Sequence, residues 1–181
     1  RSVLARDYLY EVPLDALVAN TQGSLGYLIQ RSLRQALLQR GIATPVATVL
    51  TEVRVDETDS AFEEPTKPIG QFFRPDQAHE MSERYGWLMV DDGHRGYRRV
   101  VSSPSPVEIV QLDVIRACLQ AGQIVVCCGG GGIPVVSSKT GAIQGIEAVI
   151  DKDRVAAMLA VRLMAETLVI TTAVPHVYVD F

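Results

Sequence analysis

Apolar residues recur at helical spacing from residue 14 to about residue 39. Pro13 can occupy the first turn of this helix, and Gly41 can end it. Gly23 and Gly26 lie inside the pattern and lower helix stability. They therefore predict either a bend or a second backbone packed closely against the helix. The periodic apolar positions are Leu14, Leu17, Val18, Leu25, Leu28, Ile29, Leu33 and Leu37.

Short apolar runs rich in β-branched residues predict strands in the rest of the chain. These runs cover residues 46–53, 97–101, 124–128, 134–137 and 168–172. After the fourth of them, Lys139, Thr140 and Gly141 are typical of a hairpin turn.

Two further helices have recognisable N-terminal signals. Ser105 and Glu108 have the spacing of a capping box, and Pro106 would occupy the first helical position. This predicts a helix that continues to Gly122, with a buried apolar stripe. Asp151 can cap another helix, which would run to about residue 164.

The residues from 56 to 93 differ in character from the apolar pattern around them. Charges and prolines predominate there, which predicts a loop-rich excursion with one short helix near residues 76–85. We interpret residues 56–93 as a small protruding subdomain inserted within a single domain that covers residues 1–181. Elsewhere apolar strands alternate with helices, which implies parallel crossovers. The predicted fold is therefore α/β, a three-layer αβα sandwich around a mostly parallel sheet.

Composition and charge argue against several functional classes. A net charge of −4 and a pI near 5.4 do not suit a nucleic-acid-binding surface, which needs a clustered basic patch. No apolar run approaches the length of a membrane span. The three cysteines and three histidines lack metal-ligand spacing, which predicts no metal site and free thiols in a reducing cytoplasm. The chain opens at Arg1 without a methionine, so we expect its natural start to lie upstream.

The glycine run, residues 129–132, is the strongest local signal for chemistry. Gly129, Gly130, Gly131 and Gly132 directly follow a predicted buried strand. Open α/β sheets bind ligands at the carboxyl ends of their strands, and successive backbone N–H groups can form a nest for an anion. A tight turn requires fewer glycines than four, so we favour a phosphate or substrate site. The run matches neither the P-loop nor the dinucleotide fingerprint.

Lys152 and Asp153 form the second signal, at the start of the helix that Asp151 would cap. Taken alone, the pattern favours an ordinary helix start, in which Asp153 suits the positive helix end and Lys152 is solvated. In the functional interpretation, a lysine held beside a carboxylate neutralises charge on a transferring phosphoryl group.

Three other basic residues are candidates. Lys67 lies between Pro65 and Pro68, and prolines stiffen a backbone that would deliver a lysine over a cleft. A loop lysine is normally only solvated, so this signal is weak by itself. Arg98 and Arg99 are more commonly one packed and one solvated arginine on a strand than an anion clamp. They are kept as candidates for substrate binding.

Six stretches together resemble the carbamate kinase branch of the amino-acid kinase family. They follow the order of the family over nearly the whole chain. The glycine run occurs across the wider family, whereas Pro-Thr-Lys-Pro-Ile-Gly and Arg-Gly-Tyr-Arg-Arg single out carbamate kinases. The stretches are residues 21–27, 65–70, 95–101, 104–110, 129–134 and 145–153.

This resemblance implies a reaction in which ATP and carbamate give ADP and carbamoyl phosphate, typically run toward ATP in arginine fermentation. Lys152 would contact the nucleotide phosphates, Asp153 would orient the catalytic lysines, and Lys67 would reach the phosphoryl and carbamate site. The glycine run would line that site. Mg²⁺ would arrive with the nucleotide and need few or no protein ligands. The enzyme would be a cytoplasmic homodimer.

The sequence also departs from the family pattern. It lacks the initial Gly-Gly-Asn-Ala phosphate loop, the Gly-Asn-Gly turn and the C-terminal lysine segment. We therefore expect the chain to be incomplete at both ends and inactive by itself. Near residues 171–176 related kinases often carry an aspartate that is missing here, which leaves contacts to the nucleotide base open.

Two alternative functions are considered. The first is an amino-acid kinase with another substrate, such as acetylglutamate or uridylate. The proline-flanked Lys67 argues against it. The second is a non-catalytic binding module derived from the family, against which the retention of Lys152 and Asp153 argues.

Overall fold

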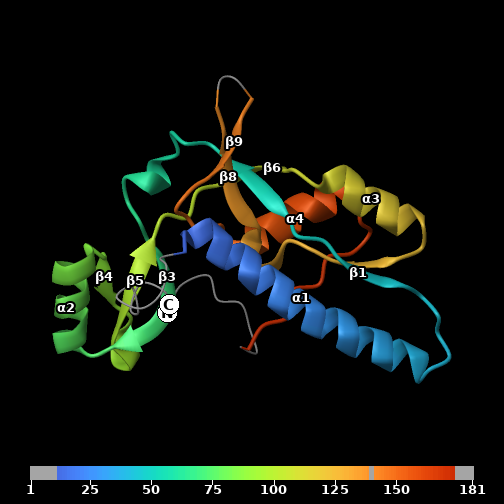
Figure 1. Ribbon diagram of the computed structural model, residues 1–181, viewed down its shortest axis with the longest axis horizontal. Helices are drawn as coiled ribbons and strands as arrows, with labels where there is room; N and C mark the ends of the chain where they lie inside the picture. The colour runs from blue at the N-terminus through green and yellow to red at the C-terminus, as the bar shows by residue number, and fades with distance from the viewer. Residues whose placement is uncertain (1–11, 139–140, 174–181) are drawn as a thin grey trace.

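The computed structural model describes residues 12–138 and 141–173, which form a mixed α/β structure (Figure 1). The helices are α1 (Leu14–Leu38), α2 (Pro75–Tyr85), α3 (Leu112–Gln120) and α4 (Lys152–Leu163). The strands are β1 (Val46–Thr48), β2 (Glu52–Val55), β3 (Lys67–Phe73), β4 (Met89–Asp91), β5 (Tyr97–Val101), β6 (Pro106–Ile109), β7 (Ile124–Val126), β8 (Ile133–Ser137) and β9 (Ile143–Gly145). Short 3₁₀ turns are η2 (Ser60–Phe62), η3 (Gly93–Arg95) and η4 (Gly129–Gly131).

Helix α1 follows its predicted span. Pro13 directly precedes it, and Gly41 adopts a φ of +70° just beyond its end. A Cβ on Gly26 would lie 2.3 Å from the Cγ2 of Thr48, so this glycine lets α1 cross β1 at close range. Close packing is therefore found at Gly26, although it comes from the side chain of Thr48 and not from a second backbone, whereas nothing comes within 4 Å of a Cβ on Gly23.

The glycine run lies between β7 and β8, and each of these strands pairs in parallel with an earlier strand. β1 pairs in parallel with β7, and β2 pairs in parallel with β8. Antiparallel strands extend the second of these sheets in the order β6-β2-β8-β9. The predicted hairpin is the β8–β9 pair, although Lys139 and Thr140 of its turn lie outside the described residues.

The main core lies between the sheet that contains β2 and the helices α3 and α4, which contact each other. Val53 and Val55 of β2 are buried with Ile115 of α3 and Val155 of α4. Helix α1 contacts β1, β7 and β8 and runs across the molecule in Figure 1. The arrangement of helices around strands confirms the predicted α/β class, since each element buries one apolar face.

A separate three-stranded antiparallel sheet, β3-β5-β4, lies with α2 at one end of the molecule (Figure 1). Its own apolar cluster contains Phe73, Met81 and Trp87, and the rings of Phe73 and Trp87 meet edge to face at 6.3 Å. Helix α2 matches the predicted short helix. The segment predicted as loop-rich, however, contains the seven-residue strand β3, and the sheet includes β5, beyond residue 93.

The strand predicted over residues 46–53 is two strands in different sheets, β1 and β2. Between them the side chain of Gln22 substitutes for a strand partner. Its Oε1 accepts a hydrogen bond from the Thr51 N–H at 2.8 Å, and its Nε2 donates to the Thr51 carbonyl at 3.1 Å. Because this long-range bond satisfies the buried backbone locally, the chain can change direction there.

The helix predicted from residue 105 to residue 122 begins later, at Leu112. Residues 106–109 instead form β6, which pairs with β2, so the proposed capping box is wrong. The Ser105 N–H donates to Asp59 at 2.9 Å, and Glu108 pairs with Arg54 across the strands at 2.8 Å. Pairing with β2 is thus favoured over a helix at residues 106–109, because strand pairing satisfies backbone groups on both segments.

The prediction of a strand at residues 168–172 is also wrong, since the structure has no regular element there. Leu168, Val169 and Ile170 are exposed in the described part of the chain. The neighbouring residues 174–176, considered for base contacts, lie outside the described residues. No helix among the described residues is long and apolar enough to cross a membrane.

Candidate functional site

The glycine run forms a tight turn where β7 ends. Cys128 adopts a φ of +54°, and the φ angles of Gly130, Gly131 and Gly132 are +68°, +101° and +88°. The N–H groups of Gly131 and Gly132 donate to the carbonyls of Cys128 and Gly129, at 3.1 and 3.2 Å. These two donors are thus occupied by the turn, so an anion nest in this run would have to use other N–H groups than those of Gly131 and Gly132.

Close packing explains why glycines are needed at positions 131 and 132. A Cβ on Gly131 would lie 2.3 Å from the carbonyl oxygen of Ile150, and one on Gly132 would lie 2.2 Å from the Cγ2 of Val53. Gly131 therefore brings the run against the backbone at the start of α4. Gly129 and Gly130 line a cavity instead, so these two glycines remain candidates for ligand contact.

Gly131→Ala should destabilise the protein strongly. The new methyl group would meet a backbone carbonyl that cannot rotate away, and the residue must keep a positive φ. We expect the free energy of unfolding to fall by about 3 kcal/mol, combining overpacking with the left-handed conformation. Gly130→Ala is the matched control, because its φ is also positive but no atom lies within 4 Å. It should lose only about 1–2 kcal/mol in urea unfolding. Equal losses would contradict this packing argument.

Asp151 joins α4 to the three-stranded sheet. Its Oδ1 accepts hydrogen bonds from the N–H groups of Asp153 at 2.9 Å and Arg154 at 3.4 Å, which confirms the predicted N-cap. Its Oδ2 accepts a hydrogen bond from the Nζ of Lys67 at 2.5 Å. One carboxylate therefore caps the helix and holds a lysine that is 84 residues away in sequence.

Lys67 is the first residue of β3 rather than a loop residue. It lies opposite Val101 of β5, so the sheet fixes its backbone. The side chains of Lys67 and Asp151 are 28% and 30% exposed, which leaves the pair accessible to a small ligand. Sequence reasoning found Lys67 but missed its partner. The available signal was that an N-cap aspartate uses one oxygen for the helix and leaves the other free.

The hydrogen bond from Lys67 lowers the pKa of Asp151 from 3.8 to about 2, with helix N–H bonds adding to the effect and burial opposing it. Because the folded-state pKa is depressed, the stabilisation is present above about pH 4 and disappears as the pH falls toward 2. The pair is therefore intact at neutral pH.

Asp151→Asn should reveal this dependence, since asparagine keeps the helix cap but loses the charge. We expect the variant to be less stable than the wild type by about 1–2 kcal/mol from pH 5 to pH 8, after allowing for solvent screening. The difference should shrink between about pH 4 and pH 2. Urea unfolding of both proteins over this range provides the measurement. A difference that does not change with pH would rule out the charged pair as its cause.

Lys152 and Asp153 lie at the first turn of α4, as predicted. Their side chains are 70% and 53% exposed, and the Nζ of Lys152 lies 3.7 Å from Asp153 Oδ1. The backbone of Lys152 lies against Gly131, so the structure brings Lys152, the glycine run and Lys67 to one end of α4. Asp153 is paired with Lys152, whereas Lys67 is held by Asp151.

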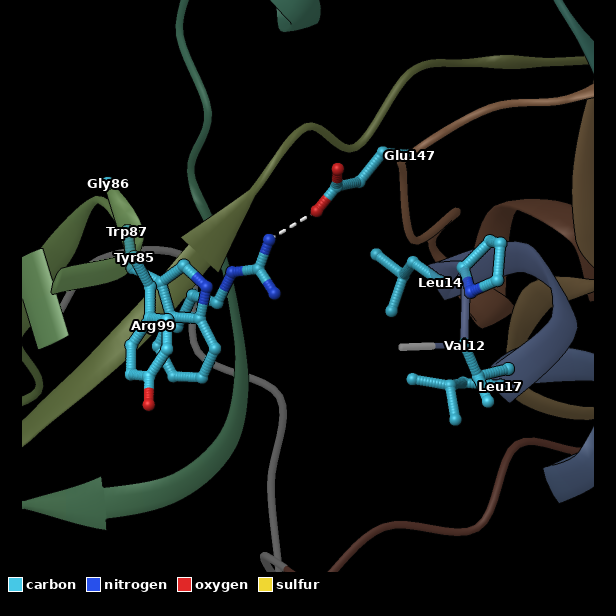
Figure 2. A pocket seen from close by; sticks show the side chains of 9 residues that line it. Val12, Leu14, Leu17, Tyr85, Gly86, Trp87, Arg99 and Glu147 are labelled. Atoms are coloured by element: carbon cyan, nitrogen blue, oxygen red, sulfur yellow. Dashed lines mark hydrogen bonds and ion pairs between the residues drawn. The ribbon is translucent and has the colours of Figure 1, made fainter. Parts of the chain in front are cut away.

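Two adjoining cavities lie between α1 and the three-stranded sheet. The larger, about 560 Å³, has Gly129 and Gly130 on one wall, Thr21 of α1 on another and Ile69 of β3 opposite. The smaller, about 520 Å³, is bounded by the start of α1, Trp87 and Glu147 (Figure 2). The wall of the larger cavity is mainly apolar, whereas the wall of the smaller one is more polar than apolar. Both cavities are also lined by Arg99.

The two adjacent arginines have different environments. Arg98 donates to Asp92 at 3.3 Å and to the Pro68 carbonyl at 3.2 Å, within the three-stranded sheet and its loops. Arg98 is not among the described residues that line either cavity. Arg99 is therefore the better placed of the two candidates for substrate binding.

The described residues contain no cluster of three or more histidine, cysteine or carboxylate side chains that could hold a metal ion. The three cysteines are free thiols. A hydrogen bond with Cys127, together with burial, raises the pKa of the Cys128 thiol above its usual range. Cys128 therefore behaves as a packed, protonated side chain next to the glycine run.

Most of the chain matches a known protein family. The model of the amino acid kinase family matches residues 28–181. The chain belongs to the amino acid kinase family. Among its relatives, a carbamate kinase from Clostridium perfringens (strain 13 / Type A) is 46% identical over 169 residues, which are 93% of this chain and 54% of the relative. The carbamate kinase-like protein YqeA of Escherichia coli (strain K12) is 46% identical over 170 residues, 94% of this chain and 54% of that protein.

A solved structure also matches this chain. The carbamate kinase from Giardia lamblia bound to AMP-PNP superimposes with a TM-score of 0.77 at 35% identity, covering 90% of this chain and 51% of that one. The chain thus spans about half the length of the curated relatives it matches. The family likeness agrees with the α/β fold and with the resemblance drawn from the sequence.

Proposed function

We propose that the protein acts as a carbamate kinase and transfers a phosphoryl group between ATP and carbamate, with Lys67 and Lys152 as catalytic residues. The observation that carries the proposal is the pairing of Lys67 with Asp151 beside the glycine run. It brings a lysine of the stretch that singles out carbamate kinases to the helix end where a phosphate would approach. The carbamate kinases among the relatives support the same activity.

The residues act in this proposal through charge and position. A lysine Nζ has three donors, and Asp151 takes one of those of Lys67, so two remain for oxygens of the transferring group. Lys152 brings a second positive charge to the same end of α4, where the helix dipole also favours anions. Phosphoryl transfer depends mainly on such positioning and charge compensation. Asp151 would then orient Lys67, and Asp153 would orient Lys152.

The nucleotide would be ATP or ADP with Mg²⁺. The structure fits a phosphate at Gly129 and Gly130, because glycine lets an anion approach the backbone at the cavity wall. Magnesium would enter on the phosphate oxygens, which is its usual mode of binding with nucleotides. Carbamate, or carbamoyl phosphate in the reverse direction, would occupy the space beside Lys67. We further propose that the enzyme works in the cytoplasm and forms ATP in arginine fermentation.

A substrate panel tests the proposed activity. The protein expressed from its complete reading frame would be given carbamoyl phosphate and ADP, and ATP formation would be followed by luciferase. Parallel assays would follow ADP formation from ATP with acetylglutamate or uridylate. We expect ATP from carbamoyl phosphate and no turnover with the other acceptors. Turnover with another acceptor would indicate a different amino-acid kinase, and nucleotide binding without any turnover would indicate a binding module.

Assembly as a symmetric homodimer is part of the proposal. Helix α1 has apolar side chains on more than one face, and Leu25, Leu28, Ile29 and Leu38 are exposed in the described structure. A second copy that covers α1 would remove this surface from water. Light scattering at micromolar concentration should give twice the chain mass. A monomer at that concentration would contradict this assignment.

A further inference from the structure

Three contacts connect the three-stranded sheet to residues 147–151, just before α4. Arg99 of β5 forms an ion pair with Glu147 (Figure 2). The Val149 N–H donates to the Ser102 carbonyl at 3.0 Å. Lys67 of β3 reaches Asp151. Arg99, Ser102 and Lys67 lie on or next to two paired strands, while their partners follow one another at alternate positions of one short segment. The contacts therefore form a row along a single junction.

Strand pairing makes the first and last contacts of this row dependent on each other. Lys67 lies opposite Val101 of β5, and Ile69 lies opposite Arg99. The two ends of the row are therefore two positions apart along each strand. Because hydrogen-bonded neighbours in a sheet move together, a rotation of the sheet that separates Arg99 from Glu147 also moves the backbone of Lys67.

Trp87 holds the side chain of Arg99 on the side of the junction that belongs to the three-stranded sheet. Its guanidinium lies 4.7 Å from the centre of the Trp87 ring, and the side chain is 19% exposed. Figure 2 shows it extended toward Glu147, with Leu14 and Leu17 of α1 across the cavity. Glu147, in contrast, is 63% exposed. A pre-positioned arginine thus meets an exposed carboxylate.

We propose that Arg99 and Glu147 are positioning residues, whose ion pair fixes the angle of the three-stranded sheet so that Lys67 reaches Asp151. The contact between Ser102 and Val149 is a single backbone bond, about which the sheet could otherwise rotate. An exposed ion pair stabilises a protein little by itself. In this junction the ion pair acts on the neighbouring contact, because holding Arg99 at Glu147 raises the effective concentration of the Lys67 amine near Asp151. The catalytic consequence rests on the proposed function, whereas the geometric one does not.

The test is the chemical accessibility of the Lys67 amine. Limited acetylation with acetic anhydride, followed by mass spectrometry, would give a labelling rate for Lys67 and for the exposed Lys152. Glu147→Gln removes the ion pair but leaves Arg99 on Trp87. We expect Lys67 to be labelled about two- to fivefold faster in this variant, the range for losing one exposed ion pair. Lys152 labelling should not change.

A double-mutant cycle separates positioning from general loosening. Arg99→Gln should accelerate Lys67 labelling by the same factor, and the double variant should be no faster than either single one. Glu108→Gln is the matched control. It breaks a similar exposed pair with Arg54, on the main sheet, and should leave Lys67 labelling unchanged. Melting temperatures would show that all variants remain folded.

The outcomes are distinct from those of the substrate panel. Unchanged Lys67 labelling in Glu147→Gln would overturn the proposal even if the protein is an active carbamate kinase. Equal acceleration at Lys67 and Lys152, or fully additive effects in the double variant, would also overturn it, because each indicates general loosening. Faster labelling of Lys67 alone would support the positioning role even if another acceptor proves to be the substrate.

Discussion

Lys67→Ala is expected to lower turnover with carbamoyl phosphate and ADP by about a hundredfold or more, the usual loss when one charge-stabilising contact to a transition state is removed. The lysine lies at the end of a strand, and its amine is held at 2.5 Å from Asp151, next to the glycine run. No packed apolar atoms depend on the charge itself. The free energy of unfolding should fall only by about 1–2 kcal/mol, as for Asp151→Asn, because the same ion pair is lost, and the protein should stay folded.

Two comparisons sharpen the Lys67 experiment. Arg54→Ala removes a basic side chain of similar exposure from the main sheet, where it pairs with Glu108, and should leave turnover within about twofold. Lys67→Arg keeps the charge with a different shape, so partial activity would indicate that charge alone is insufficient. Wild-type kinetics for Lys67→Ala would show that Lys67 is not catalytic and only pairs with the helix cap Asp151.

Lys152→Ala is expected to have an effect of similar size, a loss of about 2.7–4 kcal/mol of transition-state stabilisation. The side chain is 70% exposed, so its removal leaves the fold intact. Asp153→Asn should also reduce turnover, because Lys152 loses the carboxylate 3.7 Å from its amine. The double variant should lose much less than the sum of the two, since groups that act together are not additive.

Stability and turnover, measured on the same four proteins, separate this account from an ordinary helix start. If Asp153 only complements the helix dipole, Asp153→Asn should lower stability by a few tenths to about 1 kcal/mol and leave turnover intact. The described structure already assigns the capping bonds to Asp151. A loss of stability without a loss of turnover, or full additivity in turnover, would therefore contradict a catalytic role for Lys152 and Asp153.

Much of the fold could be predicted from local patterns. The apolar spacing of α1, the cap at Asp151 and the strand before the glycine run all depend on residues within a few positions of one another. Such short-range preferences act in any tertiary context, so periodicity and capping residues located these elements. The same holds for α2, since Pro75 at its start and Gly86 directly after its end are local signals.

Two of the three mistaken elements share a physical cause. Residues 106–109 have a good helix start, yet they pair with β2, about 54 residues earlier in the chain. Residues 46–53 form a continuous β-branched run, yet the side chain of Gln22 interrupts it at Thr51. In both cases backbone groups found partners on distant segments. The two partners of each contact are too far apart in the sequence for a local pattern to include both.

The sequence by itself determined the α/β class, the candidate residues Lys67, Lys152 and Asp153, and the resemblance to carbamate kinases. Only the tertiary structure decided that Asp151 holds Lys67, and that Gly131 serves packing while Gly129 and Gly130 face a cavity. Residue type records the chemistry that a side chain can perform. Its partner depends on the register between strands and helices, which is fixed when the apolar faces of the whole chain are buried together.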